Sequence, residues 1–146
     1  MDNKLTGKAL WYLPLLSGVF IGTSYIPFPP WASLFGFVPL WIFWQQQTQL
    51  KNVFFGGVIT AFVFTMIGFN WVTYTLHEFA HLPWFFAGIG MIVYALIGHL
   101  FVAVAGMLWF WGRKKFQWSA RLSLWLMAFI TILCEANSVT VFDWNF

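Results

Sequence analysis

Long apolar runs alternate with short polar gaps along this chain. No Asp, Glu, Lys or Arg occurs in residues 9–50, 52–77 or 79–112. A helix that crosses the roughly 30 Å hydrocarbon core of a bilayer needs about 20 such residues. Each run is therefore long enough to span a membrane, and none supplies the charged surface that a water-soluble domain requires. The pattern predicts an integral membrane protein.

Proline, glycine and charged residues divide the runs into about five predicted transmembrane helices. Pro27, Pro29 and Pro30 end the first, because proline lacks the N–H that a continuing helix needs. The second is short and contains Pro39, so a kinked helix, a tilted helix or a re-entrant hairpin would fit it. The expected fold class is all-α, with residues 1–146 forming one polytopic membrane helix bundle. The predicted helices lie near residues 10–25, 31–44, 53–76, 83–111 and 121–142.

Composition supports this class and excludes others. Hydrophobic residues make up 61% of the chain and charged residues 8%, against about 25% charged in soluble domains. The net charge of +3 does not indicate nucleic-acid binding, because the basic residues flank apolar segments and form no basic face. The single cysteine, Cys134, allows no disulfide within the chain and no thiolate metal cluster.

The basic residues predict an orientation. In an alternating path every Lys and Arg falls on one side, which the positive-inside rule makes cytoplasmic. The N-terminus is then cytoplasmic and the C-terminus lies outside. A cleaved signal peptide is the rival interpretation of the N-terminus, but no small-residue cleavage site follows closely. The residues that set the orientation are Lys4, Lys8, Lys51, Arg113, Lys114, Lys115 and Arg121.

Small residues recur on one face of the predicted helix 83–111. Gly88, Ala95, Gly98 and Ala105 follow a spacing of about 3.5 residues. Helices associate in lipid where small side chains let their backbones approach closely. This face is expected to pack inward.

Three polar side chains are predicted at a similar depth in the membrane. Glu135 follows Arg121 by about 21 Å along a helix, and His99 precedes Arg113 by the same distance on an oppositely running helix. Asn70 falls in the last third of the predicted third helix. All three are therefore expected in the outer half of the bilayer, where an ionisable group must face a partner or a cavity.

Two interpretations of this polar group remain open. One is an outward-facing cavity for a lipid headgroup or another substrate. The other is hydrogen bonding between helices, with Glu135 protonated or paired to His99. Either way, Glu135 and His99 are expected to make a direct or water-bridged contact.

The segment HEFAH (residues 77–81) has the H-E-x-x-H form of zinc metalloproteases. That site needs His77 and His81 one turn apart on a continuous helix, with Glu78 activating water. Pro83 disfavours a helix through the motif, and no third protein ligand is placed for the metal. The three residues are interpreted as a chance match, and no metal or other cofactor is expected.

Two segments resemble the membrane domain of bacterial apolipoprotein N-acyltransferases. GTSYIPFPPW (residues 22–31) is similar to that family's first turn, and GFNW (residues 68–71) to its G-x-N-W near the outer end of the third helix. Pro83 before a long helix, Glu135 in the fifth helix and Trp144 near its outer end continue the order. The resemblance covers almost the whole chain, although each motif is short.

The resemblance implies a multi-pass protein of the bacterial cytoplasmic (inner) membrane. Its family transfers an acyl chain from a phospholipid to the N-terminal amine of a lipoprotein, so phospholipid and lipoprotein are the implied partners. Catalysis there belongs to a later nitrilase-like domain with a Glu-Lys-Cys triad. Cys134 cannot replace that cysteine, since it is intramembrane with no Lys nearby in sequence. The family often has an Arg soon after the helix-five Glu and a Pro before the late Trp; this chain has Ala136, Asn137 and Ser138, and Asp143.

The expected function is therefore the anchoring and lipid-access part of an apolipoprotein N-acyltransferase-like protein, either a fragment or a truncated homologue, without acyl transfer of its own. Asn70, Trp71, His99, Glu135 and Trp144 are the residues expected to structure the lipid-access region. Two alternatives remain open: a small non-enzymatic membrane protein that binds lipid or a partner, and the less favoured H-E-x-x-H protease.

Overall fold

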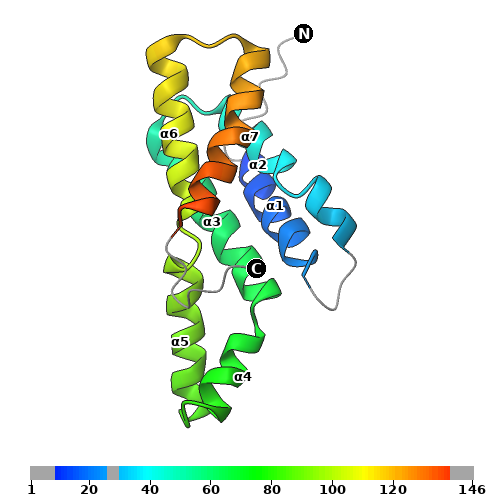
Figure 1. The fold of residues 1–146 in the computed structure, drawn as a ribbon, viewed down its shortest axis with the longest axis vertical. Helices are drawn as coiled ribbons and strands as arrows, with labels where there is room; N and C mark the ends of the chain where they lie inside the picture. The colour runs from blue at the N-terminus through cyan, green and yellow to red at the C-terminus, as the bar shows by residue number, and fades with distance from the viewer. Residues whose placement is uncertain (1–8, 26–29, 139–146) are drawn as a thin grey trace.

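A computed structural model describes residues 9–25 and 30–138, and every regular element in these ranges is a helix. Two short 3-10 helices, η1 (Ala9–Trp11) and η2 (Pro30–Leu34), precede α1 and α2. The all-α class expected from the apolar pattern is therefore confirmed (Figure 1). The α-helices are α1 (Tyr12–Gly22), α2 (Val38–Gln46), α3 (Leu50–Gly68), α4 (Trp71–Glu78), α5 (Trp84–Ile97), α6 (Phe101–Phe116) and α7 (Ala120–Ala136).

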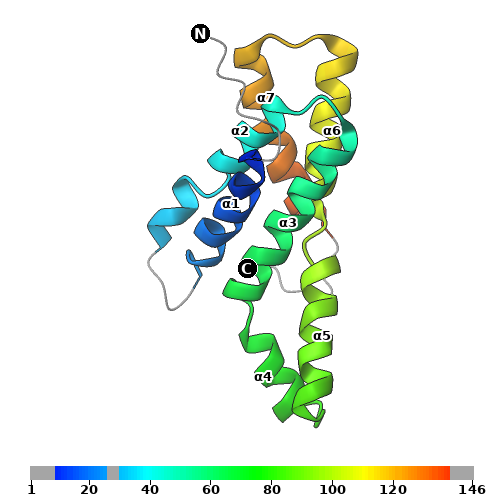
Figure 2. The same ribbon diagram turned by 180° about the vertical axis from the view of Figure 1, so that it is seen from behind.

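The centre of the molecule is α3, which lies between α1 on one side and α6 on the other (Figure 2). α2 packs on α1 and α3, and α7 packs on α6. These five helices form a body, from which the antiparallel pair α4 and α5 projects at one end (Figure 1). The turns α2–α3 and α6–α7 lie together at the other end.

Glycines let α3 approach its neighbours backbone to backbone. A Cβ on Gly57 would lie 2.6 Å from the Cα of Ala103 on α6. A Cβ on Gly18 of α1 would lie 2.9 Å from the carbonyl oxygen of Thr60 on α3. Close backbone contact of this kind is the main source of helix association in lipid, so these glycines fix the two central interfaces.

The small-residue face predicted on helix 83–111 is only partly the contact surface. Ala95 and Ala105 are buried, as expected. Gly88, however, contacts no other helix: a Cβ built on it would have no atom within 4 Å. The three atoms nearest to a Cβ built on Gly98 all belong to Tyr94, one turn earlier on the same helix. α6 approaches the backbone of α3 at Ala103, opposite Gly57, and not at the predicted glycines.

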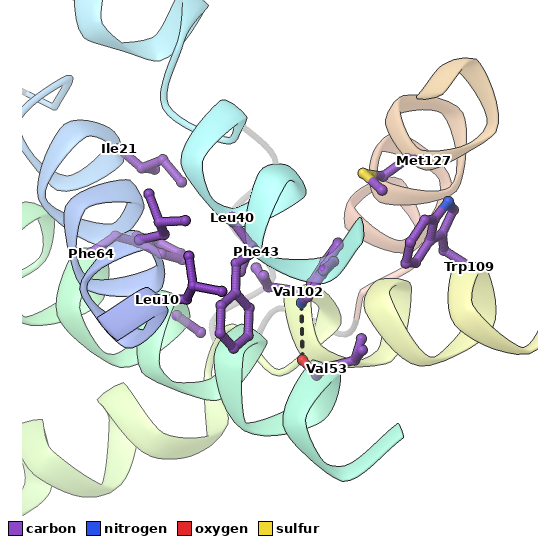
Figure 3. Packing of buried hydrophobic residues seen from close by; sticks show 12 residues of the cluster. Leu10, Ile21, Leu40, Phe43, Val53, Phe64, Val102, Trp109 and Met127 are labelled. Carbon is purple, nitrogen blue, oxygen red and sulfur yellow. Dashed lines mark hydrogen bonds between the residues drawn. The ribbon is translucent and has the colours of Figure 1, made fainter. Parts of the chain in front are cut away.

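Two tryptophans fill the core of the body and satisfy their polar atoms. Trp44 and Trp109 are fully buried, with ring centroids 6.3 Å apart. The Trp44 indole donates to the carbonyl oxygen of Val53 at 3.0 Å, the dashed line in Figure 3. The Trp109 indole donates to the carbonyl and the hydroxyl of Ser123, both at 3.1 Å. A buried indole N–H needs such a partner, and these bonds tie α2 to α3 and α6 to α7.

Three predicted helices differ from the observed ones in continuity. The predicted helix 31–44 is η2 followed by α2, in which Pro39 occupies the first turn, where its missing N–H costs nothing. The predicted helix 53–76 is broken after Gly68, and α4 begins anew at Trp71. The predicted helix 83–111 carries the turn at 98–100, where Leu100 N–H bonds back three residues to Ile97.

Two helical segments are long and apolar enough to cross a membrane by length and composition: Leu50–Gly68 and Trp84–Phe116, the second comprising α5 and α6. α1 is apolar but shorter. This is consistent with a helical membrane bundle.

Candidate functional site

His99 lies at the junction of α5 and α6 and bonds to α3. Its Nδ1 lies 2.8 Å from the hydroxyl oxygen of Thr65. That hydroxyl also lies 2.6 Å from the carbonyl oxygen of Ala61, and a carbonyl can only accept. The single Thr65 proton therefore goes to Ala61, so His99 Nδ1 carries a proton and donates to Thr65. The Nε2 of a neutral imidazole is then left as an acceptor.

Phe69 is the centre of an aromatic cluster around His99. Its ring centroid lies 4.9 Å from both the Tyr25 and the His99 rings. It also lies 6.2 Å from the Tyr94 ring and 6.3 Å from the Trp71 ring. Segments from α1, α3, α4 and α5 therefore meet at this one side chain. We call Tyr25, Phe69, Trp71, Tyr94 and His99 the aromatic cluster.

Glu135 is connected to this cluster by charge. Tyr25 follows the last turn of α1, and the charge of Glu135 acts on its phenol. The Glu135 carboxylate itself is exposed, and it lies near the end of α7, two residues before Asn137, which caps the helix.

The expected direct contact between Glu135 and His99 is not formed. Within residues 9–25 and 30–138, the carboxylate makes no ion pair with a cation, and His99 bonds Thr65. Thr65 satisfies the imidazole because the turn at 98–100 directs His99 toward α3, whereas α7 packs on α6.

Asn70 and Trp71 lie at the start of α4, Asn70 as the residue before its first turn. Asn70 is exposed and donates from Nδ2 to the carbonyl of Ile67 at 3.0 Å, holding the break between α3 and α4. Trp71 is 37% exposed and contributes its ring to the aromatic cluster. Trp144 lies outside the described residues, as does Asp143.

The H-E-x-x-H segment is not one continuous helix. α4 ends at Glu78, and His81 has a φ of 53°, in the left-handed region. His77 donates from Nδ1 to the carbonyl of Leu82 at 2.7 Å, and its ring stacks on Trp84 with centroids 4.0 Å apart. His77 therefore holds the α4–α5 turn together, and the expectation that the helix would stop within the motif is confirmed.

Sequence reasoning named Trp71, His99 and Glu135 but missed Thr65, Phe69, Tyr25 and Tyr94. Tyr25 and Phe69 both lie inside the segments GTSYIPFPPW and GFNW, so those motifs contained the signal. Thr65 could not be singled out, because a threonine in an apolar helix usually bonds its own backbone.

The fold and the site define a class: a helical protein with two membrane-length apolar segments and a polar and aromatic cluster at their junction. Comparison with known proteins narrows this class. A family model described as the apolipoprotein N-acyltransferase N-terminal domain matches residues 17–146. The chain belongs to this family. An apolipoprotein N-acyltransferase of Bdellovibrio bacteriovorus (strain HD100) is 39% identical over 132 residues, which cover 90% of this chain.

The same alignment covers 24% of the Bdellovibrio protein. The chain therefore spans about a quarter of the length of that relative. No solved structure matches the chain.

Proposed function

We propose that this chain is the membrane-anchoring and lipid-access part of an apolipoprotein N-acyltransferase of the bacterial cytoplasmic membrane. In this role it crosses the bilayer about five times, with the N-terminus cytoplasmic and the C-terminus outside. The phospholipid acyl donor and the lipoprotein acceptor are the partners. The observation that supports the proposal is the aromatic cluster around His99, with Glu135 near enough to act on Tyr25, in a chain of this family.

The depth of the junction follows from helix length. Trp84–Phe116 has 33 residues, so it is about 50 Å long, and the hydrocarbon core is about 30 Å thick. A tilt of over 50° would be needed to bury it all, beyond the 0–40° range seen for membrane helices. With Arg113 at the inner boundary, the outer boundary falls near Val93. His99 then lies about 9 Å below that boundary.

The outer turns of α5 therefore leave the hydrocarbon together with α4. Phe85 is 73% and Phe86 56% exposed there, in the zone where aromatic side chains favour the headgroup interface. A lipid that lies against this hairpin would have its headgroup at the outer turns of α5 and the upper part of its acyl chains beside His99 and Glu135. The chain thus positions a lipid without reacting with it.

Acyl transfer itself is assigned to the rest of the protein. Cys134 lies on α7, and the nearest basic residue on that helix in the described part of the chain is Arg121, about 20 Å away along the axis. A cysteine needs a nearby cation or base to become a thiolate nucleophile. Cys134 is accordingly proposed to be a packing residue.

A chimera tests the proposal. The matched segment of the Bdellovibrio relative is replaced by this chain, and transfer of a labelled acyl chain from phospholipid to a lipoprotein peptide is measured. We expect activity from the chimera and none from the chain alone. Glu135→Gln in the chimera should lower the rate about tenfold, the worth of one charge-assisted contact of roughly 1.4 kcal/mol.

Glu78→Gln is the matched control, because Glu78 is also exposed but lies at the end of α4, beyond the level of Glu135 and His99. It should leave the rate unchanged within about twofold. A folded, membrane-inserted chimera without activity would contradict the proposal. So would an acyl-enzyme trapped on Cys134 of the chain alone.

A further inference from the structure

The basic end of the molecule contains a groove that no part of the proposed acyl-transfer role uses. It has a volume of about 280 Å³ and lies between the α2–α3 turn and the end of α6. A smaller cavity of about 130 Å³ adjoins it, and Arg113 lines both. The groove is lined by Gln47, Thr48, Phe110, Arg113, Lys114 and Gln117.

Arg113 is held in place by the core. Its Nη1 donates to the carbonyl of Gln45, the penultimate residue of α2, at 3.1 Å. Its guanidinium lies 5.3 Å from the ring centroid of Trp109, which is itself fixed by the bonds to Ser123. Because a guanidinium has five N–H donors, this arrangement orients Arg113 and leaves four donors for another acceptor.

The groove has an excess of positive charge. Lys114 lines it and is exposed. Over residues 9–25 and 30–138, no carboxylate lies within 4.0 Å of any Lys or Arg, and the recorded ion pair joins His77 and Glu78 on the α4–α5 hairpin. Lys51 lies in the first turn of α3, Lys115 in the last turn of α6 and Arg121 in the first turn of α7. The turns α2–α3 and α6–α7 lie at the same end of the molecule (Figure 1).

Apolar side chains continue from the groove along α6. Trp111 is 57% and Phe116 59% exposed, and the Lys115 ammonium lies 4.7 Å and 5.5 Å from their ring centroids. Such a lysine keeps its charge at the headgroup level while its stem covers apolar surface. The last turns of α6 are therefore suited to the level where headgroups meet acyl chains.

We propose that this groove binds the phosphate of an anionic membrane lipid of the inner leaflet. The planar fork of Arg113 matches two phosphate oxygens, Lys114 adds a second positive charge, and the amides of Gln47 and Gln117 can donate to the remaining oxygens. Basic pockets at the cytoplasmic side of membrane helices are suited to anionic headgroups. A bound lipid would join α2 to α6 at the end opposite the aromatic cluster.

Lipid retention by the purified chain tests this. The chain in detergent is titrated with phosphatidylglycerol or phosphatidylcholine, and bound lipid is counted by native mass spectrometry. We expect tighter binding of phosphatidylglycerol. Arg113→Gln with Lys114→Gln should weaken that binding at least tenfold, whereas Lys115→Gln with Arg121→Gln, which removes the same charge outside the groove, should change it less than about twofold.

The single variant Lys114→Gln separates loss of binding from loss of folding. Lys114 is exposed, and its substitution leaves the hydrogen bond from Arg113 to Gln45 intact. It should weaken phosphatidylglycerol binding by threefold or more at an unchanged unfolding temperature. Equal losses in the two double variants, or no loss in any variant, would overturn the proposal. Inorganic phosphate tested alone distinguishes a lipid phosphate from a free one. Saturable phosphate binding without a preference for phosphatidylglycerol would mean that the groove binds a free anion, and would overturn the lipid proposal.

Discussion

The five-helix body and the α4–α5 hairpin have similarly apolar sequences but differ in how they are held. In the body, Trp44 and Trp109 have no exposed surface, and α3 meets α6 backbone to backbone at Gly57. In the hairpin, Phe79 is 78% exposed, and Val72 is the buried residue of α4.

The difference shows what decides packing in an apolar environment. Lipid tails are as apolar as leucine, so hydrophobicity alone does not drive one helix onto another in a membrane. Glycines and bonded indoles do this in the body, whereas in the hairpin a turn bonded by His77 joins two helices whose outer faces remain open. Substitutions should therefore have global effects in the body and local effects in the hairpin.

The largest effect is expected from Gly57→Ala. The new methyl would lie 2.6 Å from the Ala103 backbone, so α3 and α6 must separate, at a cost of about 3 kcal/mol in free energy of unfolding. Reversible unfolding in mixed micelles measures it. The control is Gly88→Ala on the hairpin helix α5, which meets nothing within 4 Å and should be neutral or stabilising by up to ~1 kcal/mol. Equal losses would remove the distinction between the two regions.

Trp109→Phe should have the next largest effect. It deletes the bond to Ser123 and leaves a void in the core, which together should lower the free energy of unfolding by about 2 kcal/mol. Trp125→Phe on α7, where the indole is 78% exposed, should cost less than about 0.5 kcal/mol. Unfolding in the same micelles compares the two variants. Similar losses in free energy of unfolding would show that the Trp109 indole does not hold α6 and α7 together.

Thr65→Val should cost about 1 kcal/mol, the size of an interhelical hydrogen bond in a membrane. It removes the acceptor of His99 Nδ1. Nitrogen-15 NMR of the imidazole should show a proton on Nδ1 in the parent and a changed tautomer population in the variant. Thr75→Val on α4, whose hydroxyl bonds Trp71 one turn back, is the control. A proton on Nε2 in the parent would contradict the assigned tautomer.

The smallest effect on global unfolding is expected from His77→Ala. It removes the bond to Leu82 and the stack on Trp84, so amide hydrogen exchange at the α4–α5 turn should become about five- to tenfold faster. The free energy of global unfolding should stay within about 0.5 kcal/mol of the parent. His81→Ala, an exposed neighbour, should change neither. A global loss would mean that the hairpin is part of the body.

The sequence predicted the all-α class, because long apolar runs without charge are typical of membrane helices. It did not predict the breaks after Gly68 and at 98–100, since a run of apolar residues looks the same whether the helix continues or turns. Gly98 was visible, but it was interpreted as a packing residue.

The sequence argument chose the candidate residues by side-chain type and depth, and it did not predict which side chains are in contact. Depth arguments place His99 and Glu135 at one level, yet depth does not say which helices are neighbours. His99 bonds to Thr65 on α3, and Glu135 acts on Tyr25 at the end of α1. These two contacts depend on which helices are neighbours around α3, and the apolar pattern does not contain that information.

The orientation of the two ends is the central claim, since it places the aromatic cluster and Glu135 in the outer leaflet and the basic groove in the inner one. Single cysteines at His81 and Gln117, each in a Cys134→Ala background, test it in bacterial cells whose outer membrane has been permeabilised. We predict that His81→Cys reacts with a membrane-impermeant maleimide in these cells and that Gln117→Cys reacts only after the inner membrane is opened. The reverse pattern, or equal labelling of both cysteines, would contradict it.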